Sequence, residues 1–419
     1  GNTTETASAS LDSSGNGTGS NYTSITIQPS GGAARTISSS IVGYTINLNG
    51  ADNVTINGLN TGGNSLTISN SNTGAAGSLR FINDAVNNVI TNCTLSGSTT
   101  STVDGVVNFS TGKFSGNNNN TISNSTICGI GSNLPSNCIQ ASGTSASIGN
   151  ANNTISGCNI QDFFNASTAS YGMTLGIGSD AWIIINNKFF QTGTRTYTSG
   201  NTHSAIIIFN GAGYTVTGNT IGFAAADGSG TYTMTGSVAT RFAAINMNAG
   251  TSLAVNSIQG NTVAGINITS SAGAVTYGVL CGIFLGAGNF NIGDVTPNTI
   301  GATTGTGSLV ATLTISQAAI VGVYSGTTGT VLIQNNNFGA FSAAGASSTT
   351  GGAVWGVSVG TTPTLLTISG NTFGNTTAEN MKAGINGVTT GNSLGYGILY
   401  NASPIVATKI IITNNTFRN

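Results

Sequence analysis

One short pattern recurs along the chain and restricts its fold more than any other feature. It is clearest at residues 366–374 (LTISGNTFG), and it returns at 214–222 as YTVTGNTIG and at 411–417 as IITNNTF. Degraded copies occupy residues 121–127 and 154–160. Repetition at an interval of about 20 to 50 residues is typical of structural units that bury a core by stacking on their neighbours.

The β-branched residue before the turn of each repeat can be used as an anchor for alignment. Successive anchors are 30 to 44 residues apart, and the segments around them alternate apolar and polar residues and are rich in Thr, Val, Ile and Asn. A period of two predicts strands rather than helices. The predicted anchors are Ile56, Ile90, Ile122, Ile155, Ile185, Val216, Ile258, Val295, Ile333, Ile368 and Ile412.

The residue two positions after each anchor is glycine or asparagine in every repeat except one, where Pro297 stands. These two residue types adopt the left-handed backbone region at the lowest cost. We therefore predict a tight corner between two strands at this position. The predicted corner residues are Gly58, Asn92, Asn124, Gly157, Asn187, Gly218, Gly260, Asn335, Gly370 and Asn414.

The position after the corner is asparagine in the last six repeats, whereas earlier repeats have Cys93, Ser125, Cys158 and Lys188 there. Side chains stacked about 4.8 Å apart along a solenoid can hydrogen bond to one another. We predict such a ladder in the C-terminal half only. The predicted ladder residues are Asn219, Asn261, Asn298, Asn336, Asn371 and Asn415.

These features predict an all-β fold, a right-handed parallel β-helix of about eleven or twelve coils with variable loops and no significant helix. We assign it to residues 22–419 as a single solenoid and interpret the polar segment 1–21 as a loop of an earlier coil. Neither end has an evident charged or helical cap. We therefore expect the chain to be part of a longer array, or a protomer that stacks on others.

Composition excludes several classes of function. Only 5% of the residues are charged and the net charge is −1, so we expect no nucleic-acid partner. No apolar run approaches the roughly 20 residues that span a bilayer. The five cysteines are odd in number and lack CxxC spacing, which argues against a disulfide framework or a zinc site. We expect them to be small buried residues, and we leave open a pairing of Cys128 with Cys138.

Three segments resemble known proteins. The repeats resemble those of the pectate-lyase-like superfamily of right-handed parallel β-helices. Residues 25–37 (ITIQPSGGAARTI), 48–59 (LNGADNVTINGL) and 79–85 (LRFINDA) are similar to parts of large secreted surface proteins of Bacteroidota. This resemblance implies an extracellular or cell-surface location and an adhesin-like or matrix role. It implies no defined chemistry.

Because the superfamily includes enzymes, we searched for catalytic residues. The ten acidic residues are scattered, with none within two positions of another, and His203 is the only histidine. Asp162, Arg195 and Asp227 fall in neighbouring coils and are weak catalytic candidates, although they belong to loops of different lengths. We find no metal motif and expect no cofactor.

The sequence thus favours a non-catalytic extracellular structural or adhesin-like rod, with end-to-end assembly into a fibre as one extension. Expected partners are other copies of the chain, flanking repeats or glycans. Three alternatives remain: a β-helix polysaccharide lyase or glycoside hydrolase, a phage tailspike and an ice-binding solenoid. The last rests on outward Thr rows beside the anchors, such as Thr121 and Thr154, although Val89 and Ile184 interrupt them.

Overall fold

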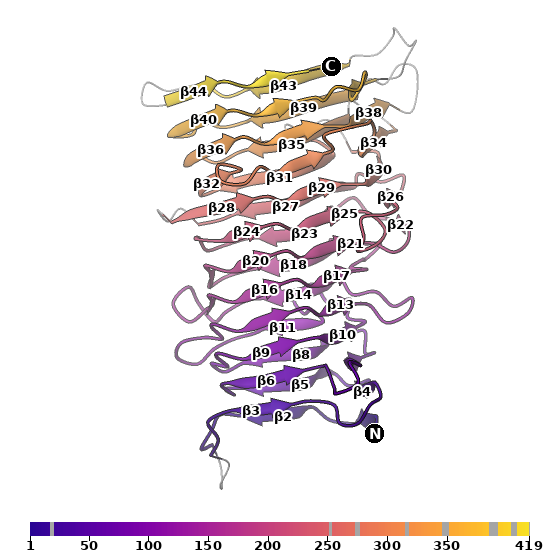
Figure 1. Ribbon diagram of the computed structural model, residues 1–419, viewed down its shortest axis with the longest axis vertical. Helices are drawn as coiled ribbons and strands as arrows, with labels where there is room; N and C mark the ends of the chain where they lie inside the picture. Colours follow the sequence, from indigo (N-terminus) through magenta and orange to yellow (C-terminus); the bar gives the residue numbers. More distant parts are fainter. Residues whose placement is uncertain are drawn as a thin grey trace. The chain divides into compact units, whose positions relative to one another are not determined.

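Short parallel strands make up the regular structure of the chain (Figure 1). The computed structural model describes residues 1–16, 21–250, 254–272, 277–314, 318–345, 352–384, 393–403 and 409–418. Within these residues all named elements are strands, and each pairs in parallel with strands of the neighbouring coils. The predicted all-β parallel solenoid is therefore confirmed.

Contacts divide the chain into two compact units. Unit 1 comprises Gly1–Asn165, Ser170–Lys188 and Ile208–Tyr214, and unit 2 comprises Ala166–Ala169, Phe189–Ile207 and Thr215–Asn419. Strands β21 (Lys188–Phe190) and β23 (Thr202–Ile208) contain residues of both units. Each unit is built from the same sheets, which we call A, B and C.

Unit 1 has three long sheets and one short one. Its sheet A contains β1 (Thr3–Glu5), β4 (Arg35–Ser39), β7 (Leu66–Asn70), β10 (Cys93–Gly97), β13 (Thr126–Cys128) and β17 (Asn159–Gln161). Its sheet B contains β2 (Ala9–Asp12), β5 (Gly43–Asn49), β8 (Ala76–Ile82), β11 (Val107–Phe109), β14 (Asn137–Ala141) and β18 (Tyr171–Leu175). Its sheet C contains β3 (Ile25–Ile27), β6 (Val54–Asn57), β9 (Val89–Thr91), β12 (Thr121–Ser123), β16 (Thr154–Ser156) and β20 (Ile183–Ile185). The short sheet pairs β15 (Asn150–Ala151) with β19 (Ser179–Asp180).

Unit 2 adds a fourth long sheet, sheet D, which follows sheet A in each coil. Its sheet A contains β25 (Thr220–Gly222), β29 (Thr262–Ala264), β33 (Thr299–Gly301), β37 (Asn337–Gly339), β41 (Thr372–Phe373) and β45 (Thr416–Phe417). Its sheet B contains β27 (Arg241–Asn248), β31 (Leu280–Ala287), β35 (Ala318–Ser325), β39 (Gly352–Val359) and β43 (Leu394–Tyr400). Its sheet C contains β24 (Thr215–Thr217), β28 (Val255–Gln259), β32 (Asn289–Ile292), β36 (Thr330–Gln334), β40 (Leu365–Ser369) and β44 (Lys409–Thr413). Sheet D contains β22 (Arg195–Thr196), β26 (Tyr232–Thr235), β30 (Ile266–Ser270), β34 (Leu309–Leu313), β38 (Phe341–Gly345) and β42 (Met381–Ala383).

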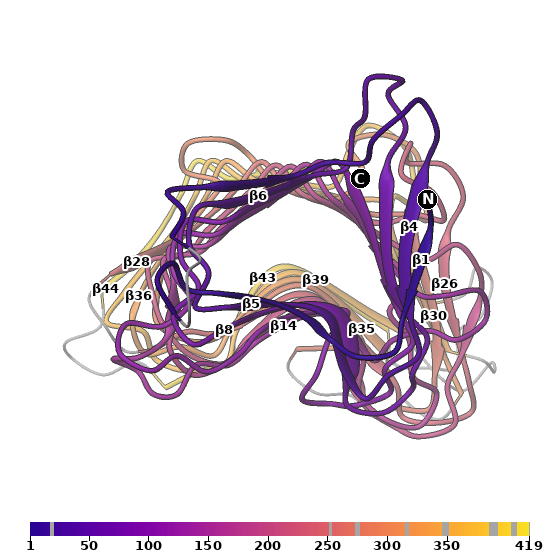
Figure 2. The same ribbon diagram turned by 90° about the horizontal axis from the view of Figure 1, so that it is seen from below.

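The segment before residue 22 also contributes to the sheets. Strand β1 pairs with β4, so that Thr4 lies beside Ser38, and β2 pairs with β5, so that Leu11 lies beside Leu48. Residues 3–12 therefore extend sheets A and B by one strand each, and Figure 2 shows these first strands beside the rest of unit 1.

The interior of unit 1 is filled by apolar side chains stacked in register along the coil axis. In sheet C, Ile56 pairs with Ile90 and Ile90 with Ile122, and all three are fully buried. In sheet B, Phe81 stacks on Phe109 with 4.4 Å between ring centroids. Each fully buried side chain of this kind contributes about 1.5–3 kcal/mol, and it lies against its equivalent in the neighbouring coil.

The interior of unit 2 pairs large residues of sheet A with glycines of sheet B. Phe373 stacks on Phe338 and on Phe417, with 5.0 Å between ring centroids in each case. Opposite Phe373, Gly356 has no side chain, and a Cβ added there would overlap the phenylalanine ring. Gly322 faces Phe338 and Gly397 faces Phe417 in the same way. In these three coils one glycine makes room for one aromatic ring, whereas in the preceding coil Gly282 faces Ile300.

Two of the predicted anchors are wrong. Ile155 pairs with Ile184, which is fully buried, so Ile185 lies on the other face of the strand. Three consecutive isoleucines occur there, and the alternating pattern of the sequence alone does not distinguish their faces. In the other case Ile292 pairs with Ile258 and Ile333, while Val295 is 81% exposed in the following loop.

Candidate functional site

Buried asparagines connect successive coils of unit 2 at the corner between sheets C and A. The Nδ2 atoms of Asn219, Asn261 and Asn298 each donate to the Oδ1 atom of the next asparagine, at 2.8–2.9 Å. The row continues from Asn336 to Asn371 at 3.1 Å and from Asn371 to Asn415 at 3.0 Å. All six residues that the repeat assigns to a ladder thus form one hydrogen-bonded row.

Each ladder residue also satisfies the backbone of the corner. Asn298 accepts from the backbone N–H of Asn261 at 2.8 Å and donates to the carbonyl oxygen of Ile258 at 2.9 Å. Its side chain is fully buried, as are those of Asn219, Asn261 and Asn371. Because an unpaired buried polar group costs about 1–3 kcal/mol, the ladder removes a penalty that recurs at every coil.

Unit 1 contains asparagine ladders that the sequence analysis missed. Asn88 donates through Nδ2 to Asn120 at 2.9 Å, and Asn120 donates to Asn153 at 3.1 Å. A parallel contact joins Asn117 to Asn150 at 2.9 Å. The prediction that ladders are confined to the C-terminal half is therefore wrong. The asparagines of this ladder stand two residues before the anchors Ile90, Ile122 and Ile155, whereas the predicted ladder uses the position after the corner.

Eight of the ten predicted corner residues adopt the left-handed conformation, with φ between 47° and 69°. Asn187 is a wrong assignment: Asn186 has φ 56°, and the Asn187 side chain instead accepts from the Cys158 backbone N–H at 2.9 Å. This error follows from the shifted anchor at Ile184. Gly58 is also a correction, since its φ is not positive. Glycine is required there because any Cβ would collide with the carbonyl oxygen of Asn92.

Carboxylates of the described loops also join neighbouring coils. Asp84 accepts the backbone N–H groups of four successive residues, 113 to 116. The shortest distance is 2.9 Å for Lys113 and Phe114, 3.1 Å for Ser115 and 2.6 Å for Gly116. Burial raises the pKa of Asp84, but these hydrogen bonds outweigh it and lower the pKa below its usual value. Asp52 accepts the Val86 N–H and Asp180 the Ala212 N–H, both at 2.9 Å.

The weak catalytic candidates are distributed over both units. Asp162 follows β17 in unit 1 with φ 60°. Arg195 and Asp227 belong to unit 2, where Arg195 Nε donates to Gln191 Oε1 at 2.5 Å and Asp227 accepts from the Ser229 N–H and hydroxyl. Arg195 and Asp227 therefore each bond to a residue close to them in the sequence. Among the described residues, no group of three or more His, Cys, Asp or Glu side chains is arranged to hold a metal ion.

The histidine and the cysteines lie in environments that suppress their usual chemistry. Burial lowers the pKa of His203 to about 3, and its ring lies 4.1 Å from that of Tyr197. Burial, with a smaller contribution from the Asp162 charge, raises the pKa of Cys128 to about 11. Cys138 is fully buried, and its thiol donates to the carbonyl oxygens of Ile127 and Gln161 at 3.5 Å. These thiols are free, and little thiolate is present at neutral pH.

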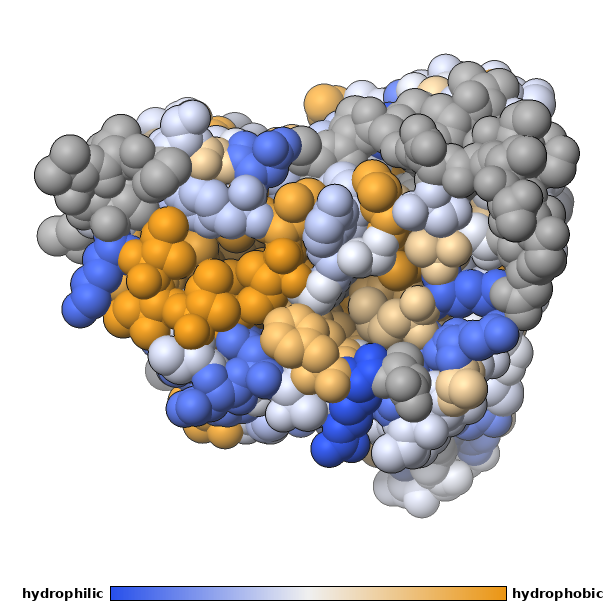
Figure 3. Space-filling model, turned by 90° about the horizontal axis from the view of Figure 1, so that it is seen from above, coloured by the Kyte–Doolittle hydropathy of each residue, from blue (hydrophilic) through white to orange (hydrophobic). Residues whose placement is uncertain are grey.

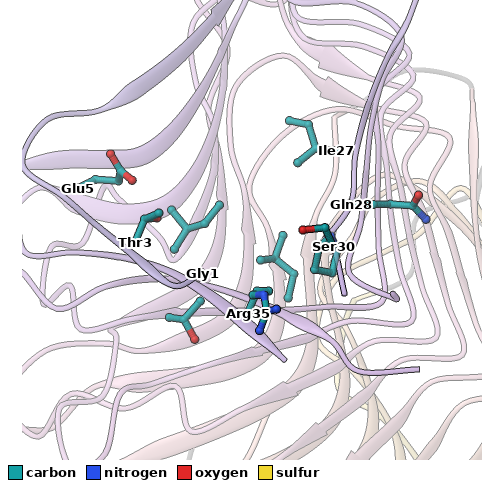
Figure 4. Close-up of a pocket in the computed structure, with 11 residues that line it drawn as sticks. Gly1, Thr3, Glu5, Ile27, Gln28, Ser30 and Arg35 are labelled. Atoms are coloured by element: carbon teal, nitrogen blue, oxygen red, sulfur yellow. The ribbon is translucent and has the colours of Figure 1, made fainter. Parts of the chain in front are cut away.

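A cavity of about 370 Å³ lies in unit 1 beside β1, β3 and β4 (Figure 4). Figure 4 shows Glu5 and Arg35 on different sides of it, and Glu5 is the only carboxylate among its lining residues. Arg35 Nη1 donates to the carbonyl oxygen of Ala34 at 3.2 Å. The lining therefore lacks the two facing carboxyl groups that glycoside hydrolysis requires.

Comparison with protein-family models, with curated proteins and with solved structures gave no match. In the described part of the chain, no helix is long and apolar enough to cross a bilayer.

Proposed function

We propose that this chain is a non-catalytic structural or adhesin-like solenoid that works outside the cell. The observation that supports the proposal is the use of polar side chains: ladder asparagines and the loop aspartates that join coils are bonded to the neighbouring coil. Side chains used in this way stabilise stacking. The extracellular location rests on the resemblance of the three segments between residues 25 and 85 to secreted surface proteins.

The proposal extends to end-to-end association. The coil that contains β43, β44 and β45 exposes large apolar side chains, and Figure 3 shows apolar residues gathered on this face. The residues are Leu394, Tyr396, Ile410, Ile412 and Phe417, which are 36–60% exposed. In the coils below, the equivalents of Ile412 and Phe417 are Ile368 and Phe373, both buried. A further coil from a second copy would cover this surface and continue the same stacks.

Electron microscopy and sedimentation over a range of protein concentrations test the association. We expect rods that lengthen with concentration, and we expect Ile412→Lys to abolish lengthening. Thr413→Lys is the matched control, because Thr413 is the next residue of the same strand and points to the opposite face. Particles that stay monomeric at the highest concentration would overturn the fibre part of the proposal.

Incubation with a panel of acidic and neutral glycans tests the non-catalytic part. We expect neither reducing sugars nor unsaturated products to form. Product formation by the wild-type chain would instead support a polysaccharide lyase or hydrolase. Loss of that activity in Asp162→Ala or Arg195→Ala would then assign it to the candidates described above.

A further inference from the structure

The outer face of sheet A in unit 1 carries two columns of hydroxyl groups. Thr67 pairs in register with Thr36 on one side and Thr94 on the other, and Thr94 pairs with Thr126. Two residues further along the strands, Ser38, Ser69 and Ser96 form a second column. The face therefore repeats Thr-x-Ser on β4, β7 and β10, and Thr-x-Cys on β13.

The hydroxyl groups at the centre of this face are not used by the protein. In the described structure, those of Thr67, Thr94 and Thr126 make no hydrogen bond, and neither do those of Ser69 and Ser96. The three threonines are partly exposed to solvent. On sheet C one pair of outward hydroxyls is used within the protein, because the Ser123 hydroxyl donates to Thr91 Oγ1 at 2.9 Å. Sheet A thus presents hydroxyls whose hydrogen bonds are left for solvent.

The array has a fixed spacing. Neighbouring strands are about 4.8 Å apart, and residues two positions apart along a strand are separated by about 6.6 Å. Threonine is stiff at χ1, so each hydroxyl and its methyl group keep one orientation. Immobilising a water costs up to about 2 kcal/mol. Waters already held by such an array have met this cost, so they lose little additional freedom when they join a lattice.

From β4 to β13 the outward positions of this face carry neither charge nor an aromatic ring, and the exposed Lys188 of β21 follows further along the sheet. Its outward positions are Thr, Ser and Cys, followed on β17 by Asn159 and Gln161. Arg35 begins β4 but is in register with the buried Leu66 rather than with the outward column. A charged polymer would find no partner here, and a glycan would find no aromatic ring on which to stack. Ordered water matches neutral hydroxyls interleaved with methyl groups.

We propose that the outer face of sheet A in unit 1 binds the surface of ice through waters held on Thr67, Thr94 and Thr126. This differs from the rows beside the anchors on sheet C, which Val89 and Ile183 interrupt. The proposal is independent of whether the solenoid assembles end to end. It assigns a ligand to a surface that the structural role leaves unused.

Partitioning of the intact chain into slowly growing ice tests this inference. We expect the wild-type protein to be enriched in the ice fraction relative to a reference protein that does not bind ice. Thr94→Tyr places a bulky ring in the array and should lower the enrichment by about tenfold or more, which corresponds to about 1.4 kcal/mol of adsorption free energy. Thr126→Tyr should act in the same way and serves if Thr94→Tyr does not fold.

The matched control is Thr121→Tyr on β12, since Thr121 is also an outward, half-buried threonine but lies on sheet C. Circular dichroism and urea unfolding establish that each variant is folded. Retained enrichment in Thr121→Tyr together with its loss in Thr94→Tyr supports the proposal. Exclusion of the wild-type chain from ice, or an equal loss in the control, would overturn it.

Discussion

A single ladder asparagine serves four buried polar groups. Asn298 accepts from the N–H and the Nδ2 of Asn261, and it donates to the Ile258 carbonyl and to Oδ1 of Asn336. Replacement by an apolar residue would leave all of these groups without that partner in a water-free interior. The main contribution of this side chain is therefore to avoid unpaired buried polar groups, because such a group costs more than a hydrogen bond contributes to stability.

We predict that Asn298→Ala destabilises unit 2 by about 3 kcal/mol or more, because several buried groups lose their partner at once. The neighbouring Asn337 is the matched control: it is partly exposed, and Asn337→Ala should change stability by no more than about 0.5 kcal/mol. Urea unfolding followed by circular dichroism measures both. Equal midpoints for the two variants would contradict a structural role for the ladder.

The neutral state of His203 makes stability depend on pH. Its pKa is about 3 in the folded chain and about 6.5 when unfolded. Above pH 6.5 both states are neutral, and as the pH falls from 6.5 towards 3 only the unfolded state gains the proton. His203 therefore causes stability to be lost on acidification, by up to about 1.4 kcal/mol per pH unit. We expect the free energy of unfolding of His203→Phe to depend less on pH between pH 6.5 and 4 than that of the wild-type chain. An unchanged pH dependence would contradict this assignment.

At the scale of elements, a row of side chains could be predicted wherever its residue stands at the same distance from the anchor in every coil. The ladder from Asn219 to Asn415 was predictable because each asparagine follows the corner of its own coil. The Asn88–Asn120–Asn153 ladder precedes the anchor instead, and it also keeps a constant phase, two residues before Ile90, Ile122 and Ile155. Ile184 was misassigned because apolar residues on both faces of β20 remove the alternation.

The hydroxyl columns of sheet A show a second limit of sequence reasoning. Thr67, Thr94 and Thr126 are visible in the sequence, but their neighbours across the sheet are 27 and 32 residues away. Only the register shows that they are adjacent, and only the side-chain contacts show that their hydroxyls are unused.

The glycine and phenylalanine columns of unit 2 are complementary elements. We predict that Gly356→Ala destabilises the fold by about 1–3 kcal/mol, because the added methyl overlaps the ring of Phe373. Phe373→Leu should also destabilise, by leaving a cavity. The double variant should be more stable than the sum of the two changes predicts, because the methyl group added at position 356 would occupy space that the smaller leucine at position 373 leaves empty. A double-mutant cycle from urea unfolding measures this coupling, and simple additivity would contradict direct packing.

At the scale of the molecule, the low charge restricts how copies can associate. The chain has nine basic and ten acidic residues in 419, so long-range electrostatic attraction between copies is weak. The exposed residues Ile410, Ile412 and Phe417 would associate by the hydrophobic effect. Such association responds to solvent conditions in a characteristic way, which separates it from association through charged loops.

We therefore predict that end-to-end association changes little between low and high sodium chloride, because there is little charge to screen. Ammonium sulfate should strengthen it, and cooling should weaken it, since both alter the cost of exposing apolar surface. Sedimentation at several salt concentrations and temperatures measures all three responses, with Ile412→Lys as the variant that should lose them. Association that weakens steeply with sodium chloride would place the contact on the charged loops, because an apolar coil face has no charge for the salt to screen.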